Sequence, residues 1–192
     1  MAVPIDAIRA IHNGFRKDMA AIDTAAYSAA RGRGGLGPVL KRFAFFSEIL
    51  LWHATGEEEA VFPELESVAP LVAEAYERDH RGLDSLCDLV RQTANASDPL
   101  ATARATAALN FHLGIHLNKE DAHLYRIFSE RVSLPKQGAI VGKMAQKVPQ
   151  ERFPEFVGWL FPLLGPGDRE NMTRIFKQVM PEPAFDQTSK SL

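Results

Sequence analysis

The sequence predicts an all-α fold, an up-and-down antiparallel four-helix bundle with a short helical C-terminal extension. Apolar side chains recur at helical spacing in four long segments, and clusters of glycine and proline separate these segments. The second pair of segments also repeats the residue pattern of the first pair. Helices joined by modest connections pack as antiparallel neighbours, so we expect the bundle over residues 1–132 and the extension over 133–192.

The first two helices are predicted on either side of a glycine-rich stretch. Residues 4–27 carry apolar side chains at helical spacing, and Pro4 stands where a first helical turn tolerates proline. Residues 31–37 are too rich in glycine to continue this helix, and Pro38 is a plausible point for the next one to begin. In the second helix, around residues 41–65, aromatic and aliphatic residues are so dense that much of it must be buried.

The third and fourth helices are predicted from the same kinds of boundary residue. Pro63 and Pro70 bracket the next break, and the third helix is expected over residues 71–93. A turn-forming run then leads to Pro99, near which the fourth helix begins before continuing to about residue 130.

The composition limits which partners and which metal ligands the protein can have. The formal net charge is −2 and 24% of the residues are charged, so the balance does not suggest nucleic acid or an anionic membrane as a partner. No segment approaches a membrane span, and polar residues interrupt the first apolar run, so we expect a cytoplasmic protein. Cys87 is the single cysteine, which excludes a thiolate cluster. A metal here must use nitrogen and oxygen ligands.

An internal repeat divides the bundle into two helical hairpins. Each half has one helix with a lone histidine, His12 or His80, followed by a helix with a His-x-x-x-Glu pair. The matched stretches are His53-x-x-x-Glu57-Glu58-x-x-Val61-Phe62 and His116-x-x-x-Glu120-Asp121-x-x-Leu124-Tyr125. Two such hairpins facing each other predict a pseudo-symmetric site.

The two His-x-x-x-Glu pairs favour metal binding. Residues four apart share one face of a helix, so each pair directs an imidazole and a carboxylate the same way. We expect apolar surroundings for both pairs, from Leu50, Leu51, Trp52, Phe111, Leu113 and Ile115. Burying a carboxylate there without a partner would cost at least several kcal/mol, and a cation would offset this cost.

The number of ligands narrows the kind of metal site. Imidazole and carboxylate ligands suit iron, manganese or zinc. One histidine from each of four helices plus two carboxylates exceeds what a tetrahedral zinc site needs, but suits two metals bridged by the carboxylates. The sequence therefore predicts a dinuclear redox centre.

These residues resemble the hemerythrin-like, or HHE cation-binding, domain family over about residues 5–130. That family places a histidine on helices 1 and 3 and a His-x-x-x-Glu pair on helices 2 and 4. The resemblance implies a hemerythrin-like bundle with two iron ions and an oxo or hydroxo bridge. The histidines of helices 1 and 2 would bind one iron, those of helices 3 and 4 the other, and the two glutamates would bridge them. The implied ligands are His12, His53, Glu57, His80, His116 and Glu120.

One position departs from the oxygen-carrying hemerythrins. They have a second histidine four residues before the one on helix 3, where this chain has Tyr76. The second iron would then have an open position or Tyr76 as an oxygen ligand, and simple reversible oxygen carriage is not expected. The set is more similar to the iron- and oxygen-sensing hemerythrin domains of ubiquitin ligases in animals and plants, and to many bacterial HHE proteins.

The tail adds a weaker resemblance. Residues 137–186 look similar to the segment that follows the hemerythrin domains of the plant ligases. They predict two or three short helices, with a break at residues 165–167, Asp168 as an N-cap and Pro181 at the end of the last one. We expect its aromatic side chains to pack on the bundle or on a partner, namely Phe153, Phe156, Trp159, Phe161 and Phe176.

Other polar residues have simpler interpretations. A lone buried histidine is more often a hydrogen-bonded structural residue than a ligand. We expect a packing or outer-sphere role for His112, a peripheral place for His123, and hydrogen bonding for Tyr76 more than ligation. The remaining acidic neighbours should form a solvated face or support the ligands, namely Glu58, Glu59 and Asp121.

A ferritin-like di-iron site is the main structural alternative. The Glu-x-x-His motif of that class occurs at Glu77 to His80 and at Glu120 to His123. The first helix offers no glutamate for such a site, and three of the histidines above would have no role.

Three function classes follow. The leading hypothesis is a di-iron protein that binds or senses oxygen, nitric oxide or iron, with a protein partner or oligomer at the extension. The second is a di-iron enzyme that consumes peroxide or activates oxygen, with Tyr76 or His112 handling protons. The third is a structural interaction module without metal, whose stability would be indifferent to chelators.

Overall fold

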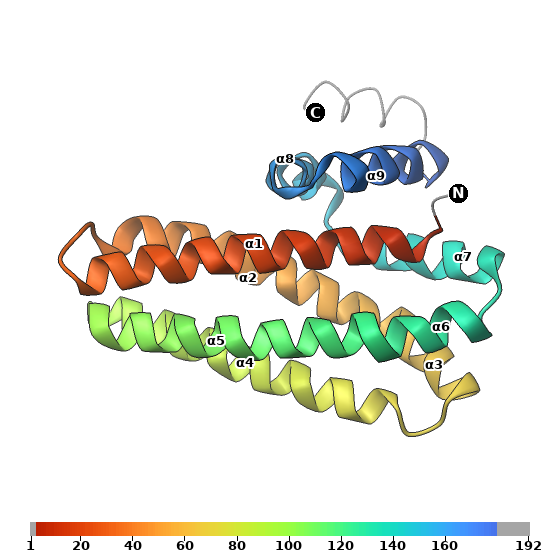
Figure 1. Ribbon diagram of the computed structural model, residues 1–192, viewed down its shortest axis with the longest axis horizontal. Coiled ribbons are helices and arrows are strands. Elements are labelled where there is room, and N and C mark those ends of the chain that lie inside the picture. Colours follow the sequence, from red (N-terminus) through yellow and green to blue (C-terminus); the bar gives the residue numbers. More distant parts are fainter. Residues whose placement is uncertain (1–2, 180–192) are drawn as a thin grey trace.

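A computed structural model describes residues 3–179 and confirms the all-α bundle, with no strand in that range. The first hairpin contains α1 (Ile5–Ala30), α2 (Leu36–Gly56), η1 (Glu57–Val61) and α3 (Phe62–Val68). The second contains α4 (Ala73–Asn95), α5 (Pro99–Lys119), η2 (Glu120–Leu124) and α6 (Tyr125–Arg131). Figure 1 shows the long helices side by side, and contacts run from α1 to α2, α2 to α4, α4 to α5 and α5 back to α1.

Two π-helical turns, η1 and η2, interrupt the second helix of each hairpin at equivalent places. The N–H of Phe62 donates to the carbonyl of Glu57, and the N–H of Tyr125 donates to that of Glu120, each five residues back. A π turn inserts one extra residue without ending the helix, and such turns are frequent at functional sites. The residue five positions after each glutamate, Phe62 or Tyr125, therefore lies one turn further along the helix on the same side as the glutamate.

The break predicted between Pro63 and Pro70 begins near the end of that range. The π turn resets the hydrogen-bond ladder, so that Pro63 falls in the first turn of α3, where a missing N–H is tolerated. The chain leaves the helix only after Val68, and Leu71 in the connection has a left-handed φ of 69°. The α1–α2 connection is shorter than expected, and Gly32 and Gly34 supply its positive φ angles of 72° and 108°.

The C-terminal residues form three helices and a short 3-10 turn that pack on the bundle. They are α7 (Leu134–Ala145), η3 (Gln150–Arg152), α8 (Phe153–Leu163) and α9 (Pro166–Val179). Helix α7 contacts α2 and η1, whereas α8 and α9 contact α1, as Figure 1 shows. Buried side chains of these helices join the bundle in one apolar core.

The prediction of Asp168 as an N-cap is wrong. Asp168 lies inside the first turn of α9, because Pro166 already begins the helix, as proline often does. Its carboxylate instead accepts a hydrogen bond of 3.1 Å from the Asn13 side chain of α1. The chain breaks at Gly165 as expected, and Pro181 is outside the described residues.

Two glycines mark where this extension meets the helices of the bundle. A Cβ on Gly56 would lie 3.2 Å from Cβ and Cγ of Met144 in α7. A Cβ on Gly14 would lie 3.0 Å from Leu160 Cδ1 and 3.3 Å from the Trp159 ring of α8. Trp159 also donates its indole N–H to Asp18 at 2.7 Å. A side chain at either position would therefore force its neighbour in the extension to shift.

The expectation of apolar surroundings around both His-x-x-x-Glu pairs is partly wrong. Leu50 and Leu113 are buried, but Leu51, Phe111 and Ile115 are 54%, 65% and 45% exposed. Successive residues of a helix point about 100° apart, so sequence neighbours of a buried residue can face water. The apolar environment comes mainly from residues three or four positions away and from other helices.

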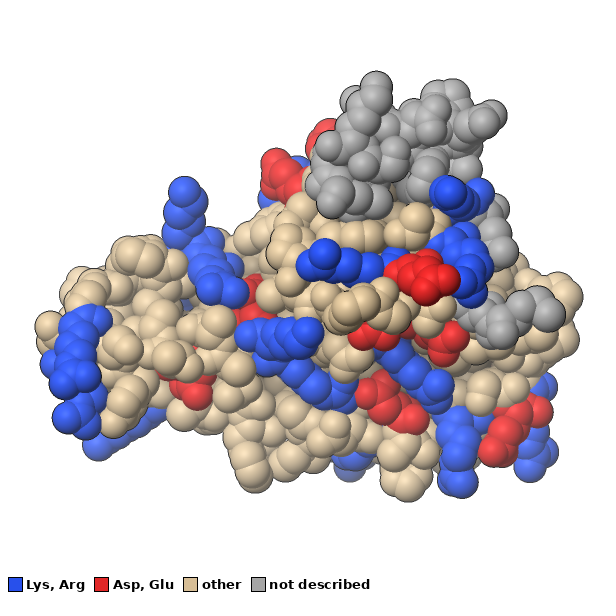
Figure 2. Space-filling model, turned by 45° about the horizontal axis from the view of Figure 1, so that its top comes forward, with Lys and Arg blue, Asp and Glu red and all other residues tan. Residues whose placement is uncertain are grey.

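The surface agrees with the near-neutral composition. Figure 2 shows basic and acidic side chains interspersed over the face in view, without a broad field of one sign. None of the helices within residues 3–179 combines the length and apolar character that crossing a membrane requires.

We predict that Gly56→Leu lowers the free energy of unfolding by about 1–3 kcal/mol, because the new side chain would overpack against Met144. The matched control is Gly82→Leu on the exposed face of α4, where an added Cβ meets nothing within 4 Å. It should gain roughly 0.5–1 kcal/mol from the better helix former. Urea denaturation in the presence of a chelator measures both. Equal stability of the two variants would show that α7 is not held at Gly56.

Candidate metal centre

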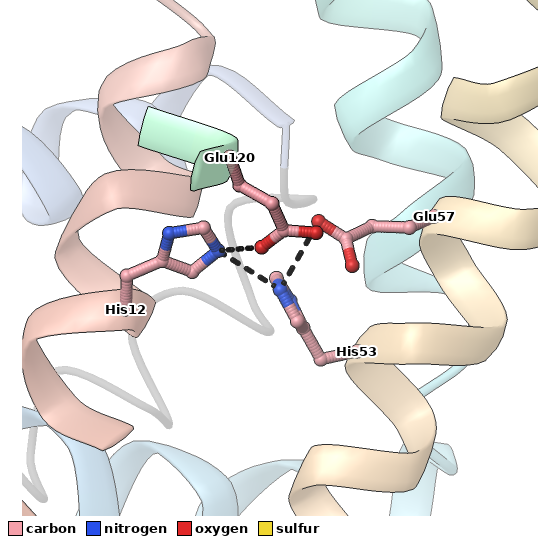
Figure 3. A group of neighbouring side chains, drawn as sticks. All are labelled: His12, His53, Glu57 and Glu120. Carbon is pink, nitrogen blue, oxygen red and sulfur yellow. Dashed lines mark hydrogen bonds and ion pairs between the residues drawn. The ribbon is translucent and has the colours of Figure 1, made fainter. Parts of the chain in front are cut away.

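The structure brings all six predicted ligand residues together in the bundle core. Their side chains form two groups of four that could each hold a metal ion, and within each group the ligand atoms lie within 4.8 Å of one another. Glu57 and Glu120 belong to both groups. The first group adds His12 and His53, as Figure 3 shows, and the second adds His80 and His116. All six residues are buried.

The four imidazoles direct Nε2 toward the shared carboxylates. His53 Nε2 lies 3.1 Å from His12 Nε2 and 3.3 Å from Glu57 Oε1 (Figure 3). On the other side, His80 Nε2 lies 3.4 Å from Glu57 Oε2, and His116 Nε2 lies 3.2 Å from Glu120 Oε1. Each glutamate thus has one oxygen near each group of histidines, since Glu120 Oε2 is 3.5 Å from His12 Nε2.

Carboxylates hold the outer nitrogens of two of these histidines and lie near that of a third. Nδ1 of His12 lies 2.9 Å from Asp121, and Nδ1 of His80 lies 2.8 Å from Glu58. These two acids occupy equivalent positions of the repeat, and the interpretation that they support ligands fits this geometry. Nδ1 of His116 lies 3.5 Å from Asp79, which also pairs with Lys119. An acid at Nδ1 fixes the imidazole orientation and makes Nε2 a better ligand.

Sequence reasoning missed the roles of Asp79 and Tyr125. The Tyr125 hydroxyl donates a hydrogen bond to Glu57 Oε1 in the core. Burial, followed by the nearby Glu57 and Glu120 carboxylates, raises the pKa of Tyr125 well above its usual value, so it remains a neutral donor. The repeat had placed Tyr125 opposite Phe62, whose ring instead stacks on His80 with centroids 5.5 Å apart. The two halves of the centre therefore differ at this position.

Tyr76 is placed as a hydrogen-bonding residue. Its hydroxyl donates to the backbone carbonyl of Lys119 at 3.2 Å. Burial raises the pKa of Tyr76 to about 12, which keeps the phenol protonated.

The remaining histidines and the ferritin-like motifs lie elsewhere. His112 and His123 are exposed. Glu77 is paired with Arg81 at 3.9 Å on the surface of α4. The two Glu-x-x-His motifs are therefore not assembled into a common site.

The protein atoms alone leave this cluster poorly satisfied. Among the described residues, six buried side-chain atoms lack a hydrogen-bond partner, and all but Gln137 Oε1 belong to predicted ligands. They are Glu57 Oε2, His80 Nε2, His116 Nδ1, Glu120 Oε1 and Glu120 Oε2. Unpaired buried polar atoms are costly, and the four that face the centre, namely His80 Nε2 and the three carboxylate oxygens, fit a bound cation. Nitrogen and oxygen donors suit iron, manganese or zinc.

Charges within the cluster are strongly coupled. Burial would raise the pKa of Glu57, but its interactions with His53 and His80 outweigh burial and hold it well below the usual range. Burial and the neighbouring Glu57 carboxylate raise the pKa of Glu120 well above its usual value. Burial opposes charge on His80, yet the nearby Glu120 and Glu57 carboxylates raise its pKa to about 11. Burial lowers the pKa of His116 to about 4. The protons on His80 and Glu120 thus offset part of the negative charge of the cluster when no cation is bound.

Two open spaces adjoin the histidines. A void of about 10 Å³ lies among His53, His80 and His116, and its other lining residues are Leu50, Ala54, Leu83, Asp84 and Leu117. This volume is about that of one water-sized probe, so it suits a very small ligand. A larger and more polar pocket of about 400 Å³ reaches His116 from the surface between α4 and α5, past Asp79, His112 and Lys119.

Comparisons with known proteins agree with this picture. A family model described as the hemerythrin HHE cation binding domain matches residues 3–128. The chain is 24% identical over 147 residues to the zinc finger protein BRUTUS of Arabidopsis thaliana. The aligned region covers 73% of this chain and 12% of that protein. A BRUTUS-like zinc finger protein of the same plant is 24% identical over 180 residues, 88% of this chain and 14% of the relative. No solved structure gives a significant match.

We predict that Tyr125→Phe lowers the free energy of unfolding of the metal-free protein by about 1–3 kcal/mol, because it leaves a buried carboxylate oxygen without its donor. Tyr27→Phe is the matched control, since the Tyr27 side chain is 57% exposed and its hydroxyl meets only Arg31. Chemical denaturation should show almost no change for the control. A similarly small effect at Tyr125 would contradict the role given to its hydroxyl.

We also predict that cation binding releases protons. Below pH 11, about the pKa of His80, that residue must lose its proton before Nε2 can bind a cation. Glu120, whose pKa is raised by burial and by Glu57, must also lose a proton before both of its oxygens can bind. Apparent affinity should therefore rise with pH through the neutral range. Calorimetric titration with Zn²⁺ in buffers of different ionisation enthalpy measures the released protons. Heats independent of the buffer would disprove this proton linkage.

Proposed function

Since the chain belongs to the hemerythrin HHE cation-binding domain family, we propose that it is a cytoplasmic non-haem di-iron protein that binds or senses oxygen, nitric oxide or iron and redox state. The observation that carries this proposal is the pair of four-residue groups that share Glu57 and Glu120. One group would hold the first iron and the other group the second, with the two glutamates as bridging ligands. Two irons so held would supply exchangeable coordination positions and one-electron redox chemistry.

The surrounding residues are suited to a small ligand more than to a large substrate. The void beside His53, His80 and His116 has room for a molecule of about the size of water. Tyr125 holds a proton at its hydroxyl oxygen against Glu57, which steadies one carboxylate orientation. Asp121 and Glu58 steady His12 and His80 in the same manner.

Sensing requires that the centre communicate with another part of the molecule. We propose that residues 1–132 form the metal-binding part and residues 133–192 the part that reports its state to a protein partner or a second copy. Helix α7 packs on Gly56, directly before the bridging Glu57, and α8 packs on Gly14, two residues after His12. A shift of either ligand helix on iron loss would therefore displace a helix of the extension.

The polar pocket at His116 favours a second candidate function. It opens to solvent and presents His112 and Lys119 beside the second histidine pair, which would admit hydrogen peroxide. Peroxide consumption by the same centre is therefore the alternative. Steady turnover of peroxide would favour the enzyme, whereas a stoichiometric spectral change without turnover would favour binding or sensing.

The decisive test is metal analysis with an absorption spectrum, on protein purified aerobically and on protein reconstituted anaerobically with ferrous salt. We predict about two irons per chain, one for each group, and near-ultraviolet charge-transfer bands. His53→Ala should lose both iron and bands, because it removes a ligand of the first group.

The control is His112→Ala, which removes an exposed histidine of the same protein and should keep iron content and spectrum unchanged. Iron-loaded wild type should also be more resistant to unfolding than chelator-treated protein, as expected when a ligand binds only the folded state. No iron after reconstitution, with stability indifferent to chelator, would overturn the proposal in favour of a metal-free interaction module.

A further inference from the structure

A second, apolar cavity lies between the bundle and the C-terminal extension. Its volume is about 80 Å³, and its walls come from α1, α2, α7, α8 and α9. The side chains around it are aliphatic, aromatic or thioether groups, for example Ile8, Ile49, Val141, Met172 and Ile175. His53 is the one titratable side chain among its described lining residues.

Such a cavity is a poor site for water. A buried water molecule needs two to four polar partners, and these walls offer almost none. Apolar cavities in proteins stay dry, and one of about 150 Å³ binds benzene or xenon. The present cavity is about half that size. Its volume and lining together favour an uncharged apolar occupant smaller than benzene.

The position of His53 relates this cavity to the candidate metal centre. The same imidazole lines the 80 Å³ cavity on one side and the 10 Å³ void among the centre's histidines on the other. The polar pocket lies on the opposite hairpin, at His116. The centre thus has an apolar side toward the extension and a polar side toward solvent.

We propose that the apolar cavity is a separate binding site for an apolar diatomic molecule, with dioxygen or nitric oxide as the class of ligand. The site raises the local concentration of that molecule beside His53. Its existence follows from the cavity, whereas the supply of a ligand to iron rests on the proposed function. Because α7, α8 and α9 complete the walls, the extension is required to form it.

Gly142 of α7 allows the cavity to be filled without moving a neighbour. It lines the cavity, and a Cβ added to it meets nothing within 4 Å. Gly142→Leu should therefore grow into open space. Gly138→Leu is the matched control on the same helix, one turn earlier and outside the cavity lining, where an added Cβ meets only Pro4 at 3.9 Å. Both variants gain the same helix propensity, so their folding should be comparable.

Xenon is the probe for the first experiment, because it is apolar, close in size to a diatomic gas and independent of iron chemistry. Xenon NMR titration of the full chain, with and without iron, should show saturable binding to wild type and to Gly138→Leu, and its loss in Gly142→Leu. Xenon-pressurised crystals of wild type should place the atom among Ile8, Ile49 and Ile175. Absence of saturable binding to wild type, or equal binding by all three proteins, would overturn the proposed site.

A second measurement separates the site from the function. Stopped-flow association of oxygen or nitric oxide with iron-loaded protein should be slower in Gly142→Leu than in wild type, and unchanged in Gly138→Leu. Equal rates in all three would overturn the supply role. Saturable xenon binding without any gas reaction of the iron-loaded protein would support the site and disprove the proposed function.

Discussion

The burial of two carboxylates at one place in the core is the constraint on which the rest of the structure depends. Glu57 and Glu120 are both fully buried, and their mutual repulsion contributes to raising the pKa of Glu120. Neither could stay there without positive charge or protons nearby. The four histidines supply nitrogen atoms at about 3.2–3.8 Å from these oxygens. Each of those histidines comes from a different helix of the bundle, so the centre can form only when all four helices are packed together.

The two π turns show how each carboxylate is integrated into its helix. Each turn starts at the glutamate itself, and its extra residue places Phe62 or Tyr125 above the centre. The repeat makes these two positions equivalent in the backbone but different in chemistry. Tyr125 adds a proton donor for Glu57, whereas Phe62 adds only an apolar stack on His80. A pseudo-symmetric scaffold thus gives an asymmetric site, in which one carboxylate is held more firmly than the other.

The sequence sufficed to predict the four helices and the grouping of His53 with Glu57, because residues four apart must share a helix face. It did not suffice for features that depend on packing between helices. The π turns add a residue without any glycine or proline at the insertion, and Pro63 did not show that the helix continues to Val68. Neighbours such as Phe111 were expected to be buried because they are apolar, although helix geometry turns them outward. The hydroxyl of Tyr125 finds its acceptor 68 residues away, a contact that no local pattern encodes.

The extension gives the centre an environment that the bundle alone would lack. Without α7 and α9, the apolar wall beside His53 would face water, and Ile8, Ile49 and Trp52 would lose much of their burial. Helices α7 and α8 rest on Gly56 and Gly14, so any motion of α2 or α1 alters the cavity as well as the contact. The shape of the apolar cavity and the position of the extension therefore depend on the same few residues.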